Sequence, residues 1–362
     1  MRKTSFGESV RLIGRGIRNW VTEKPLVVIF AVTDSCSCHC KHCEYGGPKQ
    51  DAEIMLPGDY GEYVKALRPN VVHVSGGEPL LRKDIVEVVS SIKEPNGLLP
   101  YLILVSNWSP MTKELYLKLR DAGLNQFSVS LDFPDERHDD FRGSPGLFAK
   151  LDRVIPSCAE LGYDDIVLNT CITSENYRHI NDCADVALDW GVNINFSLYS
   201  TGRTGDESLF PGSARQLSAI KDEFDSLNKR RNGRNWITNS KTNIDETYRF
   251  INTRGRAGCQ AGRRFLEIKP DGKLQPCFAH GLKYELEQRR EMIREFTERN
   301  ACGQCYVSVR AYLDKGFWRT LYEYGSAFFS FRPLRSFKNR TDHVEWGVKG
   351  LLRNDRGRVI TS

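Results

Sequence analysis

Four cysteines lie within eight residues near the start of the chain, at Cys36, Cys38, Cys40 and Cys43. Three of them, Cys36, Cys40 and Cys43, have the spacing C-x3-C-x2-C. Thiolates are the usual ligands of iron–sulfur clusters, and they also bind zinc. Three thiolates on one loop hold three irons of a cubane [4Fe–4S] cluster and leave its fourth iron open to a small molecule. The residues alone leave a zinc site or a group of unrelated thiols as alternatives.

A second set of cysteines lies in the last third of the chain, at Cys259, Cys277, Cys302 and Cys305. The first two bracket a Pro-Asp-Gly turn within 265–275, and the last two form C-x2-C. Four thiolates from three places can enclose a metal completely, as structural zinc or as a [4Fe–4S] cluster. The remaining thiols are interpreted as spare or buried: Cys38, Cys158, Cys171 and Cys183.

Six short apolar runs rich in β-branched residues must position these side chains. They predict buried strands at 26–32, 71–75, 102–106, 127–131, 166–170 and 192–198. Segments of helical composition separate the runs, at 59–67, 80–92, 112–122, 147–161 and 177–190. This alternation predicts a parallel α/β fold, and six units predict a partial (β/α)6 barrel, since a closed one needs eight. Further along, a helix is predicted at 214–229, a hairpin at 265–275 and a charged helix at 283–299.

Polar residues follow the predicted strands where each strand ends. They are Gly76, Gly77, Glu78 and Pro79 after the second strand, Asn107 after the third, and Ser130, Asp132 and Arg142 around and after the end of the fourth. Glycines let a backbone approach a ligand closely, Glu78 can accept a hydrogen bond from a cationic amine, and Arg142 can bind a carboxylate with two hydrogen bonds. Because parallel strands end on one side of a barrel, these residues are expected to meet the first cysteines.

Together these motifs resemble the radical S-adenosylmethionine (radical SAM) superfamily, whose members bind a [4Fe–4S] cluster in the loop after the first strand. Cys36, Cys40 and Cys43 match its cluster motif, and His42 stands where the family usually has an aromatic residue. The resemblance implies that Gly76, Gly77, Glu78 and Pro79 contact the amino group of S-adenosylmethionine. It further implies that Ser130 and Arg142 hold the carboxylate and ribose with Asp132 nearby, and that Asn107 contacts cofactor or substrate.

The second cysteine set resembles the auxiliary-cluster domains called SPASM and, in a shorter form, twitch. The pattern Cys259-x12-Gly272-x4-Cys277 is similar to the opening of those domains, and no cysteine follows Cys305. The resemblance implies a twitch-type domain with one auxiliary [4Fe–4S] cluster, for which structural zinc is the alternative. Four ligands would close that cluster, so it would carry electrons, for example by taking one from a substrate radical.

The activity that the resemblance implies is reductive cleavage of S-adenosylmethionine to a 5′-deoxyadenosyl radical, which abstracts a hydrogen atom from an unidentified substrate. A one-electron reductant such as flavodoxin or ferredoxin is implied as partner. The substrate class stays open between a peptide, in a maturase, and a lipid or small molecule, in an oxidase. A non-enzymatic iron–sulfur electron-transfer protein is the competing class, but it gives no role to Glu78, Ser130 or Arg142.

The predicted organisation has five parts: a basic amphipathic helix at 1–24, a radical SAM partial barrel at 25–200, a linker with helical segments at 201–254, a twitch-like domain at 255–306 and a basic, aromatic extension at 307–362. The net charge is +6, with +4 in 1–24, +5 in 325–362 and about −3 in the residues between them. The N-terminal helix is expected to close the bottom of the barrel, which is the preferred interpretation, or to lie on an anionic membrane surface.

Composition excludes several classes of protein. No apolar run is long enough to span a bilayer, and no apolar segment of a secretory signal precedes the cysteines, so a cytoplasmic protein is expected, peripheral to the membrane in the second interpretation of 1–24. In that reducing compartment the eleven cysteines are expected to bind metal or to stay free rather than to form disulfides. Nucleic acid is not an expected partner, because no recognisable binding motif combines basic and aromatic residues.

Overall fold

The computed structural model describes residues 6–50, 53–93, 99–231, 236–313 and 316–318, together with short strands at 352–353 and 359–360. Most of the basic, aromatic extension predicted at 307–362 therefore lies outside the described residues. The two short strands, β9 (Leu352–Arg353) and β10 (Val359–Ile360), pair with each other in an antiparallel ladder.

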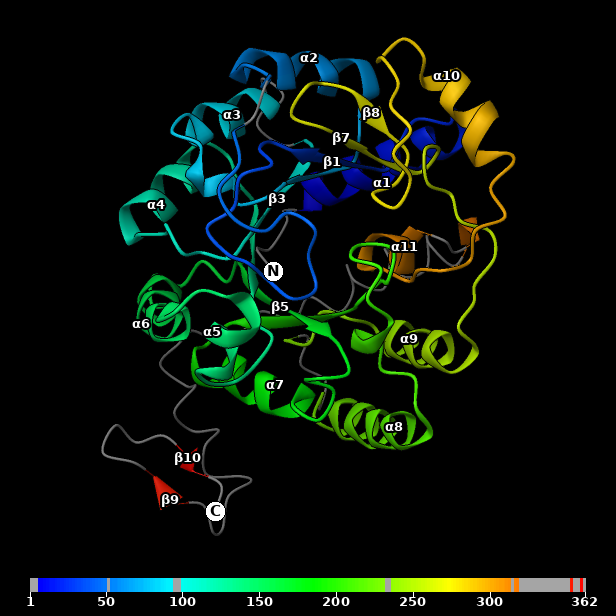
Figure 1. Ribbon diagram of the computed structural model, residues 1–362. Coiled ribbons are helices and arrows are strands. Elements are labelled where there is room, and N and C mark those ends of the chain that lie inside the picture. The colour runs from blue at the N-terminus through cyan, green and yellow to red at the C-terminus, as the bar shows by residue number, and fades with distance from the viewer. Residues whose placement is uncertain are drawn as a thin grey trace.

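Eight strands form the main sheet in the order β6-β5-β4-β3-β2-β1-β7-β8 (Figure 1). Their bounds are β1 (Val27–Ala31), β2 (Val71–Ser75), β3 (Tyr101–Ser106), β4 (Gln126–Ser130), β5 (Ile166–Ile172), β6 (Asn193–Leu198), β7 (Phe265–Ile268) and β8 (Leu274–Gln275). All neighbours pair in parallel except β7 and β8, which are antiparallel. β6 and β8 lie at the two edges of this sheet and do not pair with each other within the residues that the structure describes. The barrel is therefore open, which confirms the predicted α/β partial barrel.

Helices cover the outer side of this sheet (Figure 1). They are α2 (Pro57–Leu67), α3 (Ile85–Ile92), α4 (Lys113–Asp121), α5 (Arg137–Arg142), α6 (Leu147–Ala159), α7 (Ile180–Asp189) and α8 (Ala214–Lys229). α6 illustrates why these helices pack on the sheet. Its residues Leu147, Leu151 and Ile155 recur at helical spacing, and all three are buried. α8 has the predicted bounds, whereas α5, α9 (Lys241–Thr253) and α11 (Ser308–Leu313) were not predicted.

The two faces of β2 differ in burial. In β2, Val72 and Val74 are fully buried under the helices, whereas Val71, His73 and Ser75 on the inner face are half-buried. The prediction of strands buried on both faces is therefore wrong for β2, and β4 shows the same alternation. The reason is that helices cover only the outer face, so the inner face of the open barrel can carry polar side chains.

The hairpin predicted at 265–275 joins the barrel sheet. β7 pairs in parallel with β1, with Val27 opposite Phe265 and Phe30 opposite Ile268. The turn between β7 and β8 requires Gly272, whose φ is +79° and at which a Cβ atom would lie 2.9 Å from the hydroxyl of Tyr63. The sheet thus runs across the domain boundary predicted at residue 255.

α11 lies on the open side of the barrel (Figure 1). The Tyr312 hydroxyl donates to Asn195 Oδ1 of β6 at 3.3 Å, and Leu313 packs in a cluster with Val27 of β1 and Phe265 of β7. α11 therefore contacts strands from both ends of the open barrel. The charged helix predicted at 283–299 is shorter than expected: α10 (Arg289–Met292) continues into a π-helical turn over Ile293–Thr297.

Candidate functional site

The first cysteine loop follows β1 and is held by backbone hydrogen bonds. Cys36 N donates to Gly47 O at 3.0 Å, and Gly47 N donates to Cys38 O at 2.9 Å. A third bond, from His39 N to Arg142 O at 2.9 Å, ties the loop to the end of α5. Gly47 has a φ of +76°, and a Cβ atom there would collide with the His39 ring at 2.4 Å. These backbone hydrogen bonds and the conformation of Gly47 therefore determine the shape of the loop.

His42 takes the place of the aromatic residue expected before the last cysteine of the motif. Its ring stacks on Phe141 of α5, with centroids 4.9 Å apart and an interplanar angle of 14°. Burial lowers the pKa of His42 to about 4, so its ring is neutral at physiological pH. A neutral imidazole can replace a phenyl or phenol ring in such a stack, so the departure from the family pattern keeps the packing.

Gly76 and Gly77 bring the end of β2 against the start of the cysteine loop. A Cβ atom on Gly76 would lie 2.4 Å from Thr33 O, and one on Gly77 would lie 2.1 Å from Ser35 O. Gly77 N donates to Thr33 O, and Glu78 N donates to Ser35 O, both at 2.8 Å. The close approach expected from two glycines is thus made to the loop itself, and their contact with S-adenosylmethionine stays a prediction.

Glu78 is fully buried and ties β2 to β3. Its Oε1 accepts from Ser106 Oγ at 2.7 Å and from Leu80 N at 3.0 Å, and its Oε2 accepts from Asn107 N at 2.7 Å. Burial raises the pKa of Glu78 to about 7, although these three donors act in the opposite direction. The carboxylate therefore holds protein groups in this structure, and its expected contact with the cofactor amine stays a prediction.

Asn107 directs its side chain at the cysteine loop. Its Nδ2 lies 3.1 Å from Cys38 Sγ, 3.8 Å from Cys36 Sγ and 3.1 Å from Ser37 Oγ, and it donates to all three. Its Oδ1 accepts from Ser109 N at 2.8 Å. Asn107 lies at the end of β3 as predicted, and its donor reaches the thiols rather than an open position.

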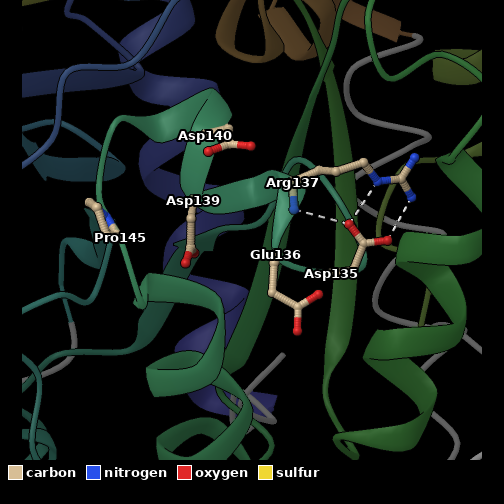
Figure 2. Close-up of a pocket in the computed structure, with 6 residues that line it drawn as sticks. All are labelled: Asp135, Glu136, Arg137, Asp139, Asp140 and Pro145. Carbon is tan, nitrogen blue, oxygen red and sulfur yellow. Dashed lines mark hydrogen bonds and ion pairs between the residues drawn. The ribbon is translucent and has the colours of Figure 1, made fainter.

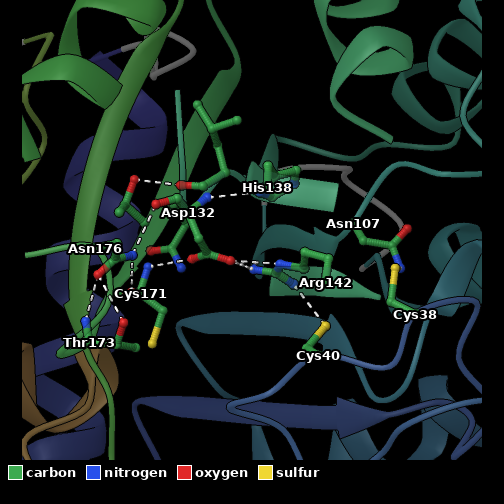
Figure 3. A network of polar contacts seen from close by, with 12 residues as sticks. Cys38, Cys40, Asn107, Asp132, His138, Arg142, Cys171, Thr173 and Asn176 are labelled. Carbon is green, nitrogen blue, oxygen red and sulfur yellow. Dashed lines mark hydrogen bonds and ion pairs between the residues drawn. The ribbon is translucent and has the colours of Figure 1, made fainter. Parts of the chain in front are cut away.

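Asp132 and Arg142 form a buried ion pair, which Figure 3 shows beside Cys40. Asp132 Oδ2 accepts from Arg142 Nε at 2.7 Å and from Arg142 Nη2 at 2.6 Å, while Oδ1 accepts from Cys171 N at 2.9 Å. Burial acts to raise the pKa of Asp132, but Arg142, the nearby histidines and the hydrogen bond from Cys171 N together hold the pKa below its ordinary value. The third nitrogen of Arg142, Nη1, lies 3.7 Å from Cys40 Sγ.

Asp132 was expected only to lie near Ser130 and Arg142, but the structure makes it the ion-pair partner of Arg142. Two of the three guanidinium nitrogens are committed to Asp132, and the third faces Cys40 Sγ. Asp132 is further fixed by His138, whose Nδ1 accepts from Asp132 N at 3.1 Å, and by Asn176, whose Nδ2 donates to Asp132 O at 3.0 Å. A contact between Arg142 and the cofactor carboxylate or ribose stays a prediction.

Ser130 lies on the inner face of the barrel among polar side chains that sequence reasoning missed. It is opposite Asn169 of β5. Asn169 accepts at Oδ1 from Asn195 Nδ2 at 2.7 Å and donates through Nδ2 to Ser197 Oγ at 3.4 Å. The sequence contained a signal for these polar side chains. Asn169, Asn195 and Ser197 interrupt otherwise apolar strands at inner-face positions.

The thiols of the first set influence one another. Cys38 hydrogen-bonds to both Cys36 and Cys40, and this bond is the main cause that lowers the pKa of Cys36 to about 6 and that of Cys40 to about 7. The pKa of Cys38 itself is raised by the same two bonds. Cys43 is half-buried, and desolvation is the main cause that raises its pKa.

The second set converges from three separate segments. Cys259 precedes β7, Cys277 follows β8, and Cys302 and Cys305 come after the π-helical turn. Burial raises the pKa of Cys277 to about 12, with further contributions from Cys305, Cys259 and Cys302, so the four thiols are close enough to interact. The fully buried Arg310 of α11 donates through Nη1 to Cys305 O at 2.5 Å and lies 3.9 Å from Cys305 Sγ.

A chain of charged residues that the sequence did not predict lies between the two cysteine sets. Arg203 Nη1 lies 3.2 Å from Glu44, the residue after Cys43, and its guanidinium lies over the ring of Phe278, the residue after Cys277, at 4.5 Å. Beside it, Lys269 Nζ donates to the Tyr45 hydroxyl at 2.9 Å, which donates to Glu267 at 3.2 Å. These contacts connect the cysteine loop with β7 and with the segment after β8.

Both cysteine sets fit thiolate-ligated clusters in chemistry. Among the described residues, no three His, Cys, Asp or Glu side chains are arranged to hold a single metal ion. Zinc draws its ligands to within about 2.3 Å of one centre, whereas a cubane spreads its irons over several corners and takes more widely spaced thiolates. N–H donors face the first set from Asn107 and Arg142 and the second from Arg310, as hydrogen bonds to cluster sulfurs require.

A surface pocket lies on the exposed side of α5 (Figure 2). It is lined by Asp135, Glu136, Arg137, Asp139, Asp140 and Pro145. Arg137 is paired with Asp135 at 2.6 Å, and Asp139 accepts from Phe148 N at 2.7 Å near the start of α6. Because His138, Phe141 and Arg142 of the same helix are buried on its other side, this pocket is separate from the cysteine loop.

A family model described as the Radical SAM superfamily matches residues 30–187, which contain the first cysteine loop and the ends of β2 to β5. Residues 30–187 form a radical SAM domain. Among curated relatives, the AdoMet-dependent heme synthase of Methanosarcina barkeri is 31% identical over 52% of this chain and 54% of its own length. The AdoMet-dependent heme synthase of Nitratidesulfovibrio vulgaris is 25% identical over 87% of this chain and 93% of its own length. The first match spans about half of that relative.

Solved structures share the fold of this chain. Streptococcus suis SuiB bound to the precursor peptide SuiA matches with a TM-score of 0.60 at 16% identity, over 80% of this chain and 73% of SuiB. The protein anSMEcpe with bound AdoMet matches with a TM-score of 0.57 at 16% identity, over 84% of this chain and 97% of its own. The curated relatives named here are enzymes.

Proposed function

We propose that this radical SAM chain reductively cleaves S-adenosylmethionine at a [4Fe–4S] cluster ligated by Cys36, Cys40 and Cys43. The observation that carries the proposal is the shape of the first cysteine loop. Its backbone is fixed by β1, β2 and α5, and donors from Asn107 and Arg142 face its sulfurs. When bound, the cluster supplies one electron that cleaves S-adenosylmethionine and yields a 5′-deoxyadenosyl radical for hydrogen abstraction.

The chain's own residues bind and orient the cofactor in this proposal. The backbone of Gly76, Gly77, Glu78 and Pro79 would meet its amino group, because the Glu78 carboxylate is engaged with Ser106 and Asn107. Ser130 would contact it from the inner face of β4. Nε and one N–H of Nη2 are engaged with Asp132, so Arg142 would reach the cofactor through the N–H groups of Nη1 and the second one of Nη2.

We further propose that Cys259, Cys277, Cys302 and Cys305 ligate a second [4Fe–4S] cluster, with 255–306 as the twitch-like auxiliary domain, 25–200 as the barrel and 201–254 as the linker. The convergence of the four thiols around Cys277 supports this, and structural zinc is the alternative. Four ligands close the cluster, so it would transfer an electron rather than bind substrate. A flavodoxin or ferredoxin would reduce the first cluster, and all eleven cysteines are free thiols, as a reducing cytoplasm favours.

Anaerobic reconstitution tests the proposal. Purified protein loaded with iron and sulfide, reduced with dithionite and mixed with S-adenosylmethionine should accumulate 5′-deoxyadenosine, detected by mass spectrometry. Cys40→Ala should form none, whereas Cys158→Ala, which removes a buried thiol of α6, should keep the activity. About eight irons with equal sulfide would indicate two [4Fe–4S] clusters, and about four irons with bound zinc would indicate the alternative second site.

Three outcomes would overturn the proposal. Iron and sulfide without any 5′-deoxyadenosine would identify a protein that only transfers electrons. Zinc without sulfide would identify a metal-stabilised protein with no radical chemistry. An unchanged yield in Cys40→Ala would show that the cluster lies elsewhere in the chain.

A further inference from the structure

α1 (Phe6–Val21) packs on the barrel through its polar side. Asn19 is 2% exposed, and its Nδ2 donates to Arg68 O at 2.8 Å and to Asn70 Oδ1 at 3.1 Å. Asn70 Nδ2 in turn donates to Leu12 O at 2.7 Å. Gly16 faces the same side chain, because a Cβ atom there would lie 3.2 Å from Asn70 Nδ2. Hydrogen bonds around one asparagine pair therefore fix the helix, as the preferred interpretation of a helix on the barrel expected.

The apolar face of α1 points outward. Val10 is 53% exposed, Ile17 39% and Val21 74%, and their spacing places all three on one side of the helix. A surface helix ordinarily buries this face. α8 does so, with Ile220 and Phe224 almost fully buried. Within the part of the chain that the structure describes, the apolar face of α1 has no such cover.

Two aromatic residues extend this face. Trp318 is 79% exposed, and its ring centroid lies 5.2 Å from that of Phe317. The ring centroid of Phe317 lies 5.5 Å from that of Trp20 in α1. We call Val10, Ile17, Val21, Phe317 and Trp318 the α1 face. Exposed tryptophan beside an apolar stripe is typical of protein surfaces that meet the headgroup region of a bilayer.

Positive charge surrounds the α1 face. Arg11 and Arg18 are exposed on one flank of the helix, and Arg68 and Arg290 are exposed near its C-terminal end. The pKa of Lys24 is lowered by burial and then by the charges of Arg289, Arg68, Arg290 and Arg18, so these cations lie close together. Of the nearby acids, Glu8 is buried and Glu23 is paired with Arg263 at 3.3 Å. The surroundings of the apolar stripe are therefore complementary to an anionic surface.

We propose that the α1 face docks on an anionic lipid surface, with the apolar stripe in the headgroup region and the arginines against lipid phosphates. The proposal is independent of the chemistry of the cysteines. A second copy is a poorer occupant, because twofold symmetry would bring Arg11 and Arg18 of one copy near those of the other. Nucleic acid would leave the apolar stripe without a partner.

Vesicle sedimentation of the full chain tests the proposal. The reconstituted protein should sediment with vesicles of phosphatidylcholine and phosphatidylglycerol at low salt, less at high salt, and weakly with pure phosphatidylcholine. Ile17→Glu should reduce binding at least tenfold. Leu188→Glu is the matched control, because Leu188 is 47% exposed on α7, away from the α1 face. Arg11→Ala and Arg18→Ala should each reduce binding about fivefold, whereas Arg178→Ala should not.

Size-exclusion chromatography and thermal melting must show that every variant is folded and of unchanged oligomeric state. Absence of binding by the unmodified chain would overturn the proposal. Equal losses in Ile17→Glu and Leu188→Glu would overturn it as well, because the effect would then not belong to the α1 face. A dimer that Ile17→Glu dissociates, without vesicle binding, would identify a second copy as the occupant. Loss of 5′-deoxyadenosine formation with intact vesicle binding would leave this proposal standing and contradict only the proposed function.

Discussion

The two cysteine sets are built from opposite kinds of sequence. The first takes Cys36, Cys40 and Cys43 from one loop of eight residues, and the second takes four cysteines from segments spread between residues 259 and 305. The first loop is fixed by neighbouring strand ends, through Gly77, Glu78 and Asn107. The second set depends on the β7–β8 hairpin and on Arg310 of α11.

The difference teaches how each site depends on the rest of the fold. A local set has its ligands close together even in an unfolded chain, so its cluster constrains little of that chain. A dispersed set closes long loops, and a metal that closes a long loop stabilises the folded state more. We therefore expect the first site to govern reactivity and the second to govern stability as well as electron transfer.

The largest expected effect separates the three matching cysteines from the fourth. Cys36→Ser should abolish 5′-deoxyadenosine formation, more than a hundredfold, because only three thiolates are proposed to bind the first cluster. Cys38→Ser should keep most of the activity, although Cys38 lies within hydrogen-bonding distance of Cys36 and Cys40. The measurement is product yield per first cluster, counted by its low-temperature electron paramagnetic resonance signal. Equal losses in both variants would show that Cys38 is a ligand.

The next prediction compares the stability contributed by the two clusters. Cys277→Ala should lower the melting temperature of the reconstituted protein by more than Cys40→Ala does, because the second set closes loops of about twenty residues and the first only loops of a few. Differential scanning calorimetry under anaerobic conditions measures both. The apoproteins of the same variants are the control and should melt within about 2 °C of each other. A larger loss in holo Cys40→Ala would reverse the comparison.

The buried ion pair at the first site gives a third prediction. Asp132→Asn leaves Arg142 buried without a counter-charge and should destabilise the apoprotein by about 3 kcal/mol. Asp135→Asn is the control, because its carboxylate is 39% exposed in a pair with Arg137 and should cost less than about 1 kcal/mol. Denaturant unfolding of the apoproteins measures the difference. Similar values for both variants would mean that the Asp132–Arg142 pair does not hold α5 against the loop.

The fourth prediction is a pH dependence at Glu78, of about the same size as the third. Its pKa in the folded protein is raised to about 7 by burial, above its ordinary value, so the folded state binds the proton more tightly than the unfolded state. The contribution of Glu78 to stability is therefore most favourable at low pH and declines by about 3 kcal/mol as the pH rises through about 4.5 to 7. Glu78→Gln should lack this decline. Denaturant unfolding across that range measures the free energy of unfolding of both proteins. The same change with pH in the unmodified protein and in Glu78→Gln would contradict the prediction.

Much of the barrel could be predicted because its signals are local. The runs around Val72 and Ile103 are apolar and β-branched, and their strands begin within one residue of the predicted positions. The pairing of β7 with β1 could not be predicted, because no residue near Phe265 indicates that this strand lies beside Val27. α9 was missed because its buried residues, among them Ile244 and Phe250, are dispersed among polar ones.

The site was predictable to the same limit. Cysteine spacing and the residues at strand ends are features of a single stretch of sequence, so Cys36, Glu78 and Asn107 were found. The directions of their side chains depend on neighbours far along the chain. That is why the inward turn of Glu78 toward Ser106 and the placement of Arg203 between Glu44 and Phe278 became visible only in the structure.

The parallel pairing of Val27 with Phe265 has a consequence for synthesis on the ribosome. β1 emerges long before β7, so one of its two edges finds this partner only after the whole segment between them has been translated. Until then the nascent chain presents an unsatisfied strand edge, a recognised starting point for aggregation. Overproduction at low temperature or with a chaperone that binds extended segments should therefore raise the yield of native protein.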